Sequence, residues 1–278
     1  MTETTIEKRF YTHPCFHQEA CGSWGRIHLP VAPNCNIQCN FCNRLYDCAN
    51  ANRPGVTRHI YTPQEAVSML QRLLYQRSDI SVAGIAGPGD PLCEPDRTLE
   101  TLRAIHAQYP RLLLCVSTNG LNLPACADAL ADAGVTHVTV TVNAIQPQIG
   151  RHIYAFVKTD SQLYKGTKAA QLLCARQNEG IIKLKRRGII VKINTVVIPG
   201  VNDKHISDIA RQAAIWQADI LNCLALIPVH DTVFAHIPAP TASQMTGIRK
   251  EAARYLPQMT HCCRCRADAV GRLHSTGT

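Results

Sequence analysis

The sequence predicts an α/β fold in which parallel strands form a partial or closed β/α barrel of the TIM type. Six short β-branched runs alternate with longer amphipathic segments, which is typical of a parallel sheet buried on both faces. Polar or glycine-rich clusters follow the carboxyl ends of several runs. Barrel enzymes build their sites there from many strands, whereas an open doubly wound sheet concentrates its site at one switch point. We therefore favour the barrel.

The elements follow one another in order along the chain. The predicted strands are residues 26–32, 80–86, 112–117, 135–142, 189–198 and 220–227. The first long helix begins at Thr62-Pro63-Gln64-Glu65, which combines a capping box with proline at the first helical position. Val67, Leu70 and Leu74 then lie on one helical face. Further helices are predicted at residues 95–107, 124–133, 161–185, 205–217 and 242–255.

Length and charge narrow the class of protein. The 278 residues contain no repeat and no flexible linker, so we expect a barrel over residues 26–257, an N-terminal extension over 1–25 and a C-terminal tail over 258–278. Lys and Arg exceed Asp and Glu by 29 to 20, a net charge of +9, which we interpret as a counter-charge for bound anions rather than a nucleic-acid footprint. No apolar run approaches the roughly 18–20 residues of a membrane span, and residues 1–9 lack a signal-peptide core. We therefore expect a cytoplasmic protein without a membrane partner.

Cysteine is the unusual residue, with 14 copies. In a reducing compartment such a number indicates metal ligation rather than disulfides. Cys35, Cys39 and Cys42 form C-x3-C-x2-C directly after the first predicted strand. Three thiolates at this spacing can bind one face of an iron–sulfur cube and leave the fourth iron open. A structural zinc site would close four positions, and an electron-transfer cluster would normally have four cysteines.

This cysteine loop resembles that of the radical S-adenosyl-L-methionine (SAM) superfamily, in which the open iron of a [4Fe-4S] cluster chelates the amino and carboxylate groups of SAM. The stretch Gly87-Pro88-Gly89-Asp90-Pro91 is similar to the superfamily's glycine-rich element after the second strand. The resemblance implies that Gly87, Gly89 and Asp90 meet the methionine ammonium of SAM, although a plain β-turn would have the same composition. The same resemblance suggests ribose or carboxylate contacts for a further three side chains, Ser117, Asn119 and Asn143.

Several longer segments are similar to the NifB family of nitrogenase cofactor biosynthesis proteins, and together they run from about residue 13 to 272. They are His13-Pro14-Cys15, the stretch from Val31 to Arg44, Tyr46-Asp47-Cys48-Ala49-Asn50, Arg53-Pro54-Gly55-Val56, Cys115-Val116-Ser117-Thr118-Asn119-Gly120, and the tail from His261 to Gly271. The fold implied is the radical SAM β/α barrel, with N- and C-terminal cysteine-bearing extensions at the barrel mouth.

The family resemblance also groups the remaining cysteines. It implies that Cys15, Cys48 and Cys115, with His28, hold a second, substrate [4Fe-4S] cluster. It implies a third cluster on Cys262 and Cys265, where Cys263 could replace either cysteine and His13 could complete the site. Cys115 could instead be a buried strand cysteine, and the tail could be a zinc knuckle. The remaining cysteines lack ligand spacing: Cys21, Cys93, Cys126, Cys174 and Cys223.

The implied activity is the fusion of two [4Fe-4S] clusters into NifB-co, the [8Fe-9S-C] precursor of the nitrogenase cofactor. One SAM would donate a methyl group to a cluster sulfide, and a 5′-deoxyadenosyl radical from a second SAM would take hydrogen from that methyl on the way to carbide. The partners implied are iron–sulfur cluster donor proteins and a separate carrier protein, because no fused carrier domain follows the barrel. We expect a monomer. The sequence departs from the family at Leu45, where a lysine is expected, at Ala51, where an acid is expected, and at residues 21–25.

Two other readings remain open. A radical SAM maturase with auxiliary clusters would act on a peptide or small molecule, but such enzymes usually carry a compact C-terminal cysteine domain. A non-catalytic iron–sulfur scaffold would close each cluster with four ligands and would have no SAM site.

Overall fold

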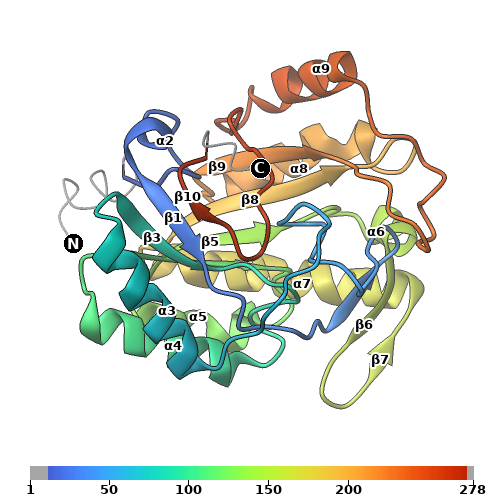
Figure 1. Cartoon of the computed structure of the whole chain (residues 1–278). Helices are drawn as coiled ribbons and strands as arrows, with labels where there is room; N and C mark the ends of the chain where they lie inside the picture. The colour runs from blue at the N-terminus through green and yellow to red at the C-terminus, as the bar shows by residue number, and fades with distance from the viewer. Residues whose placement is uncertain (1–11, 274–278) are drawn as a thin grey trace.

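The computed structural model describes residues 12–273 and contains one curled sheet of seven strands with helices on its outer face (Figure 1). Six parallel strands alternate with helices, and a short antiparallel strand lies at one edge. Among these residues no helix is both long and apolar enough to cross a bilayer. The strands of this sheet are β1 (Gly25–His28), β3 (Ile80–Ile85), β4 (Leu113–Thr118), β5 (Val135–Thr141), β8 (Ile190–Val197), β9 (Ile220–Ala225) and β10 (Val270–Gly271). The helices are α2 (Ala20–Ser23), α3 (Pro63–Gln76), α4 (Pro95–Gln108), α5 (Leu123–Asp132), α6 (Pro147–Ile153), α7 (Gly166–Arg186), α8 (Ile206–Ile215) and α9 (Ala242–Ala252).

The strand order confirms the barrel class and makes it a partial barrel. The order β10-β1-β3-β4-β5-β8-β9 follows the chain without reversal among the parallel strands. A doubly wound sheet would reverse its order at a switch point, whereas successive right-handed crossovers in one direction curl the sheet. β9 and β1 do not pair with each other, so the curled sheet is open along one side.

Side chains along each strand alternate between the two faces of the sheet, so that the outer face is apolar and the inner face is largely polar. Apolar side chains point outward to the helices and belong to one large buried cluster, including Ile27, Leu114, Val138, Val191 and Leu221. The alternate positions point inward and are largely polar or reactive, namely Arg26, His28, Cys115, Ser117, Thr139, Lys192, Asn194 and Asn222. The inside of this half-barrel is therefore a lined chamber rather than a packed core.

Helix α3 confirms the predicted capping box. The Thr62 side chain accepts a hydrogen bond from the Glu65 amide at 3.2 Å, and the Glu65 carboxylate accepts one from the Thr62 amide at 2.8 Å. This arrangement satisfies two of the unpaired donors at the helix start. Ala66, Leu70 and Leu73 then bury one helical face against the sheet.

A second, small sheet was not predicted, and it corrects one helix boundary. It consists of β2 (Ile37–Cys39), β6 (Tyr154–Lys158) and β7 (Leu163–Tyr164) in the order β2-β6-β7. The predicted helix start at residue 161 is wrong, because Leu163 and Tyr164 pair with Lys158 and Val157 of β6. The helix begins only at Gly166.

The C-terminal tail spans the open side of the half-barrel. The Met259 amide donates to the Leu221 carbonyl of β9 at 2.8 Å, and farther along β10 pairs antiparallel with β1. Figure 1 shows the last strand lying beside the first. The tail thus connects the two unpaired edges of the sheet and carries its cysteines across the opening.

The described part of the N-terminal extension, residues 12–25, does not lie at the barrel mouth, which corrects its predicted placement. Phe16 packs with Ile190, Ile220 and Met259 in a separate buried cluster. Ile190 and Ile220 are the first residues of β8 and β9, so the extension covers the amino ends of the strands. It therefore closes the half-barrel at the end opposite the loops that follow the strands.

Candidate active site

The three cysteines of the C-x3-C-x2-C loop line one cavity above the carboxyl ends of β3, β4 and β5. Strand β2 fixes this loop by pairing Ile37 and Cys39 with β6. The Gln38 side chain ties it further, since its amide donates to the Cys39 carbonyl at 3.0 Å and to the Cys42 carbonyl at 2.5 Å. Cys35, Cys39 and Cys42 therefore share one cavity, here called the loop cavity.

The donors around this loop suit a bound sulfur cluster. The Asn50 amide donates to the Cys39 sulfur at 3.5 Å, and the Asn119 amide donates to the Cys35 sulfur at 3.8 Å. Burial raises the pKa of the Cys35 and Cys39 thiols, so the bare loop holds neutral thiols that lose protons when metal binds. Within residues 12–273 no three Cys, His, Asp or Glu side chains gather closely enough for a single metal ion.

The glycine-rich element packs directly against the cysteine loop. The Gly89 amide donates to the Ala32 carbonyl at 2.6 Å, and a Cβ atom at Gly89 would lie 2.1 Å from the Asn34 carbonyl oxygen. Only glycine allows this approach of two backbones. Gly89 and Asp90 line the loop cavity, whereas Gly87, with a φ of 140°, precedes it in the turn.

Asp90 joins this element to the loop after β4. Its carboxylate accepts hydrogen bonds from the amides of Leu92 and Asn119, at 2.9 and 2.5 Å, and from the Thr118 hydroxyl at 2.9 Å. Burial raises the pKa of Asp90, and these donors oppose that shift. Asp90 thus fixes the relative position of two loops, and its contact with a SAM ammonium stays a prediction.

The three predicted polar contacts occupy different positions. Ser117 and Asn119 line the loop cavity. Asn143 is fully buried beneath it, where its amide donates to the Asn50 side-chain oxygen at 2.9 Å and its oxygen accepts from the Val196 amide at 2.8 Å. Asn143 therefore orients Asn50, which in turn contacts the cysteine sulfurs.

The interior of the half-barrel forms a second cavity, here called the interior chamber. Its thiol and imidazole groups come from the N-terminal extension, β1, β4 and the tail. They are His13, Cys15, His28, Cys115, Cys262, Cys263 and Cys265. The structure thus brings together in one space seven candidate ligands from four separate segments.

The two histidines of the chamber differ in the nitrogen that they can offer to a metal. His28 Nδ1 lies 3.1 Å from the Arg266 carbonyl, which can only accept, so the proton is on Nδ1 and the Nε2 lone pair is free. His13 Nδ1 accepts the Cys15 amide hydrogen at 3.1 Å, so its proton is on Nε2. Burial lowers the pKa of His28 to about 4 and that of His13 well below its usual value. His28 is therefore a neutral ligand ready for metal, whereas His13 would have to give up its hydrogen bond.

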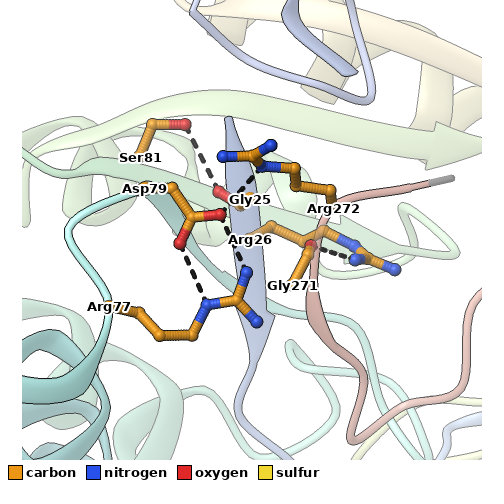
Figure 2. A network of polar contacts seen from close by, with 7 residues as sticks. All are labelled: Gly25, Arg26, Arg77, Asp79, Ser81, Gly271 and Arg272. Atoms are coloured by element: carbon orange, nitrogen blue, oxygen red, sulfur yellow. Dashed lines mark hydrogen bonds and ion pairs between the residues drawn. The ribbon is translucent and has the colours of Figure 1, made fainter. Parts of the chain in front are cut away.

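The tail is held on the chamber by a network of arginines (Figure 2). Arg26 donates to the Gly271 carbonyl and, at 2.6 Å, to the Cys265 sulfur. Asp79 accepts from Arg77 at 2.9 and 2.8 Å and from Arg272 at 3.0 Å. These hydrogen bonds, led by the two from Arg77, lower the pKa of Asp79 to about 2. The carboxylate therefore stays charged and links the tail to the turn before β3.

Cys48 lies apart from the other cysteines with which the family resemblance groups it. It lines the loop cavity together with Cys35, Cys39 and Cys42 rather than the interior chamber. Its amide donates to the Pro88 carbonyl at 2.9 Å. In this structure Cys48 therefore faces the three-cysteine loop.

The two cavities share a wall. Ala51, Ala86 and Ser117 line both of them. Ala51, the position where the family is expected to have an acidic residue, thus lies between the two cavities and offers no carboxylate there. Leu45 is 76% exposed and lines neither cavity, so the departure at this position lies outside the site.

The remaining cysteines have structural surroundings. Cys126 and Cys223 belong to the main hydrophobic core, the Cys174 thiol donates to the Ala144 carbonyl at 3.3 Å, and the Cys21 thiol donates to the Pro14 carbonyl at 3.2 Å. Cys93 lies in a small pocket beside the loop cavity. From the sequence, Arg26, Lys192 and Asn194 were not identified as lining residues of the interior chamber. The signal for them is that polar residues alternate with apolar residues in strands that were interpreted as continuous apolar runs.

Comparison with known proteins places the chain in a superfamily. The family model of the radical SAM superfamily matches residues 29–213. The FeMo cofactor biosynthesis protein NifB of Chlorobaculum tepidum is 51% identical over 259 residues, which are 93% of this chain and 61% of that protein. The NifB proteins of Klebsiella pneumoniae and Azotobacter vinelandii are 46% and 42% identical, over 94% and 96% of this chain. The chain spans between 54% and 61% of the length of these three relatives.

Solved structures with the same fold are more distant in sequence. Streptococcus suis SuiB bound to S-adenosylmethionine superposes with a TM-score of 0.60 at 15% identity, covering 85% of this chain and 50% of SuiB. Methylornithine synthase (PylB) superposes with a TM-score of 0.55 at 15% identity, covering 93% of this chain and 71% of PylB. From the family match, the cysteine loop and the partial barrel, we conclude that this chain belongs to the radical SAM superfamily and that its sequence is similar to NifB proteins.

Proposed function

We propose that this protein is a radical SAM enzyme of nitrogenase cofactor biosynthesis that fuses two [4Fe-4S] clusters, with insertion of a SAM-derived carbide, into the [8Fe-9S-C] precursor NifB-co. The observation that carries the proposal is the shared wall between the loop cavity and the interior chamber at Ala51, Ala86 and Ser117. A reaction between a SAM-derived group and a substrate cluster requires two adjacent spaces of this kind, because bound reactants must be held within reach of each other.

Each cavity has residues suited to its part. Cys35, Cys39 and Cys42 would hold a [4Fe-4S] cluster, which supplies the electron that cleaves SAM when the cofactor is bound. Asn50 and Asn119 would donate to the cluster's cysteine sulfurs and steady them. In the interior chamber, Cys15, His28 and Cys115 face the tail cysteines, so substrate clusters could be bound side by side.

One observation favours the alternative that the protein is a non-catalytic iron–sulfur scaffold. Cys48 lines the loop cavity with the other three cysteines, and a fourth thiolate on that cluster would close the iron that SAM needs. Iron–sulfur donor proteins and a carrier for the product are the partners that the fusion activity would require.

Anaerobic reconstitution with iron and sulfide, followed by SAM and dithionite, tests the proposal. Cluster fusion predicts about twelve irons per chain, since three four-iron clusters are bound, together with both S-adenosylhomocysteine and 5′-deoxyadenosine. A variant in which Cys35, Cys39 and Cys42 are all alanine should retain about eight irons and form neither product. About four irons and no SAM cleavage in the natural chain would contradict every enzyme reading.

A further inference from the structure

Lys192 is a buried cation that points into the interior chamber. It lies on β8, and its exposed fraction is 6%. Its neighbours Val191 and Ile193 point outward into the hydrophobic core, whereas Lys192 and Asn194 line the chamber. An ammonium group at this depth is strongly destabilising unless an anion compensates its charge.

The protein itself gives this ammonium only neutral partners. Its Nζ donates to the Cys15 carbonyl at 3.3 Å and to the Met259 sulfur at 3.8 Å, and it lies 4.8 Å from the centre of the Phe16 ring. No aspartate or glutamate is among the described residues that line the chamber. The compensating anion must therefore come from the chamber's thiols or from what they bind.

The thiols next to Lys192 are those of the proposed substrate site. Burial raises the pKa of Cys15 to about 12 and that of Cys115 to about 11, and the Lys192 charge opposes both shifts. Arg26, a second buried cation, donates to the Cys265 sulfur at 2.6 Å on another wall. Two cations thus face a chamber whose only anionic candidates among the described residues are cysteine sulfurs.

We propose that Lys192 binds the anionic cargo of the chamber: its ammonium donates a hydrogen bond to a sulfide or cysteine sulfur of the cluster at Cys15 and Cys115 and offsets that cluster's negative charge. This inference rests on the proposed function, because it requires that the chamber holds an iron–sulfur cluster. A merely structural lysine, anchoring the N-terminal extension through Cys15 and Phe16, makes the opposite predictions for metal-free and loaded protein.

The test uses the full chain with Cys35, Cys39 and Cys42 replaced by alanine, so that all cluster iron belongs to the chamber. In this parent, Lys192→Met should release iron to a chelator about tenfold faster, since loss of one partner leaves buried charge uncompensated. The reduction potential of the chamber clusters should become more negative, because a nearby positive charge favours the added electron. Lys192→Arg should keep both properties, and Lys250→Met, which removes an equal charge from exposed α9, should change neither.

The metal-free protein supplies the second readout. Lys192→Met should leave its melting temperature equal or higher, because an unpaired buried charge is removed. A fall in that melting temperature with unchanged iron release and potential would overturn the inference and make Lys192 structural. A parent that binds no chamber iron while Lys192 is intact would refute the proposed function itself, and the inference with it.

Discussion

At the scale of single residues, the chemistry depends on which sulfur faces which cavity. The C-x3-C-x2-C spacing predicted correctly that three cysteines share one loop, because the residues are close in the chain and a short strand orders them. The position of Cys48 could not be predicted, since its loop is irregular and two cavities lie on either side of Ala51. The tautomer of His28 could not be predicted either, because the Arg266 carbonyl that fixes it comes from the tail.

Replacing Cys48 with alanine separates the two possible roles of this thiol. If Cys48 binds a substrate cluster, the variant should hold about four irons fewer and still form 5′-deoxyadenosine within a few-fold of the natural rate. Iron analysis and product quantification by chromatography measure both quantities. Cys174→Ala is the matched control, because that thiol only donates to the Ala144 carbonyl.

Two other outcomes for Cys48→Ala would be informative. Unchanged iron with faster SAM cleavage would make Cys48 a fourth ligand of the loop cluster, whose removal opens an iron. Loss of all iron and all cleavage together would show that the grouping of cysteines by cavity is wrong.

At the scale of elements, the tail completes the site by pairing with both open edges of the sheet. The six parallel strands were predictable because each lies in a run of β-branched and apolar residues that alternates with an amphipathic helical segment. Strand β10 has two residues and β2 has three, which is too short for any period to show. Their positions are set by partners in β1 and β6, and such long-range pairing is invisible in local sequence.

The Asp79 carboxylate, clamped by Arg77 and Arg272, should hold the tail against β1. Asp79→Asn should lower the free energy of unfolding by about 1 kcal/mol, as for a partly buried ion pair with good geometry, and should speed the loss of chamber iron. The Asp79 pKa is lowered from 3.8 to about 2, so its contribution is present above about pH 4 and is lost as the pH falls toward 2. Unfolding curves at several pH values measure the lower stability and its pH dependence, and release of iron to a chelator measures the loss of chamber iron.

The control for the clamp is Glu251→Gln, which breaks an exposed ion pair between Glu251 on α9 and Arg254 beyond the end of that helix and should change neither stability nor iron retention measurably. If Asp79→Asn keeps its iron as well as this control does, the clamp does not secure the tail.

At the scale of the whole molecule, the fold encloses a chamber lined by polar side chains and candidate metal ligands. The six parallel strands and the long helices were predictable, whereas the short elements α2, α6 and β10 and the small second sheet were not. The fold class was predictable because loops rich in polar residues follow many strands. The open side and its closure by the tail were not predictable, since nothing in the strand pattern states how many strands a barrel lacks. The N-terminal extension was predicted at the mouth, but Phe16 is apolar and packs where Ile190 and Ile220 begin their strands.

The burial of several thiols predicts how the affinity of the whole protein for iron and sulfide depends on pH. Burial raises the pKa of Cys15 to about 12 and those of Cys48 and Cys115 to about 11, so these groups are neutral in the metal-free fold. Cluster binding requires thiolates and releases those protons, and the apparent affinity for iron and sulfide should therefore rise steadily between about pH 6.5 and pH 9. The His28 pKa of about 4 excludes this imidazole as a source of the released protons.

The metal-free chain should respond in the opposite sense. The pKa values of Cys15 and Cys115 lie near 9.0 in the unfolded chain and are raised by burial in the folded chain, so the free energy of unfolding should fall as the pH rises above about 9. Chelator competition for the loaded protein and thermal unfolding of the metal-free protein measure the two trends. Cys15→Ala with Cys115→Ala should flatten both, whereas Cys174→Ala should leave the affinity trend intact. An affinity that does not change with pH would mean that these thiols are not the ligands, because ligation by neutral buried thiols must release protons.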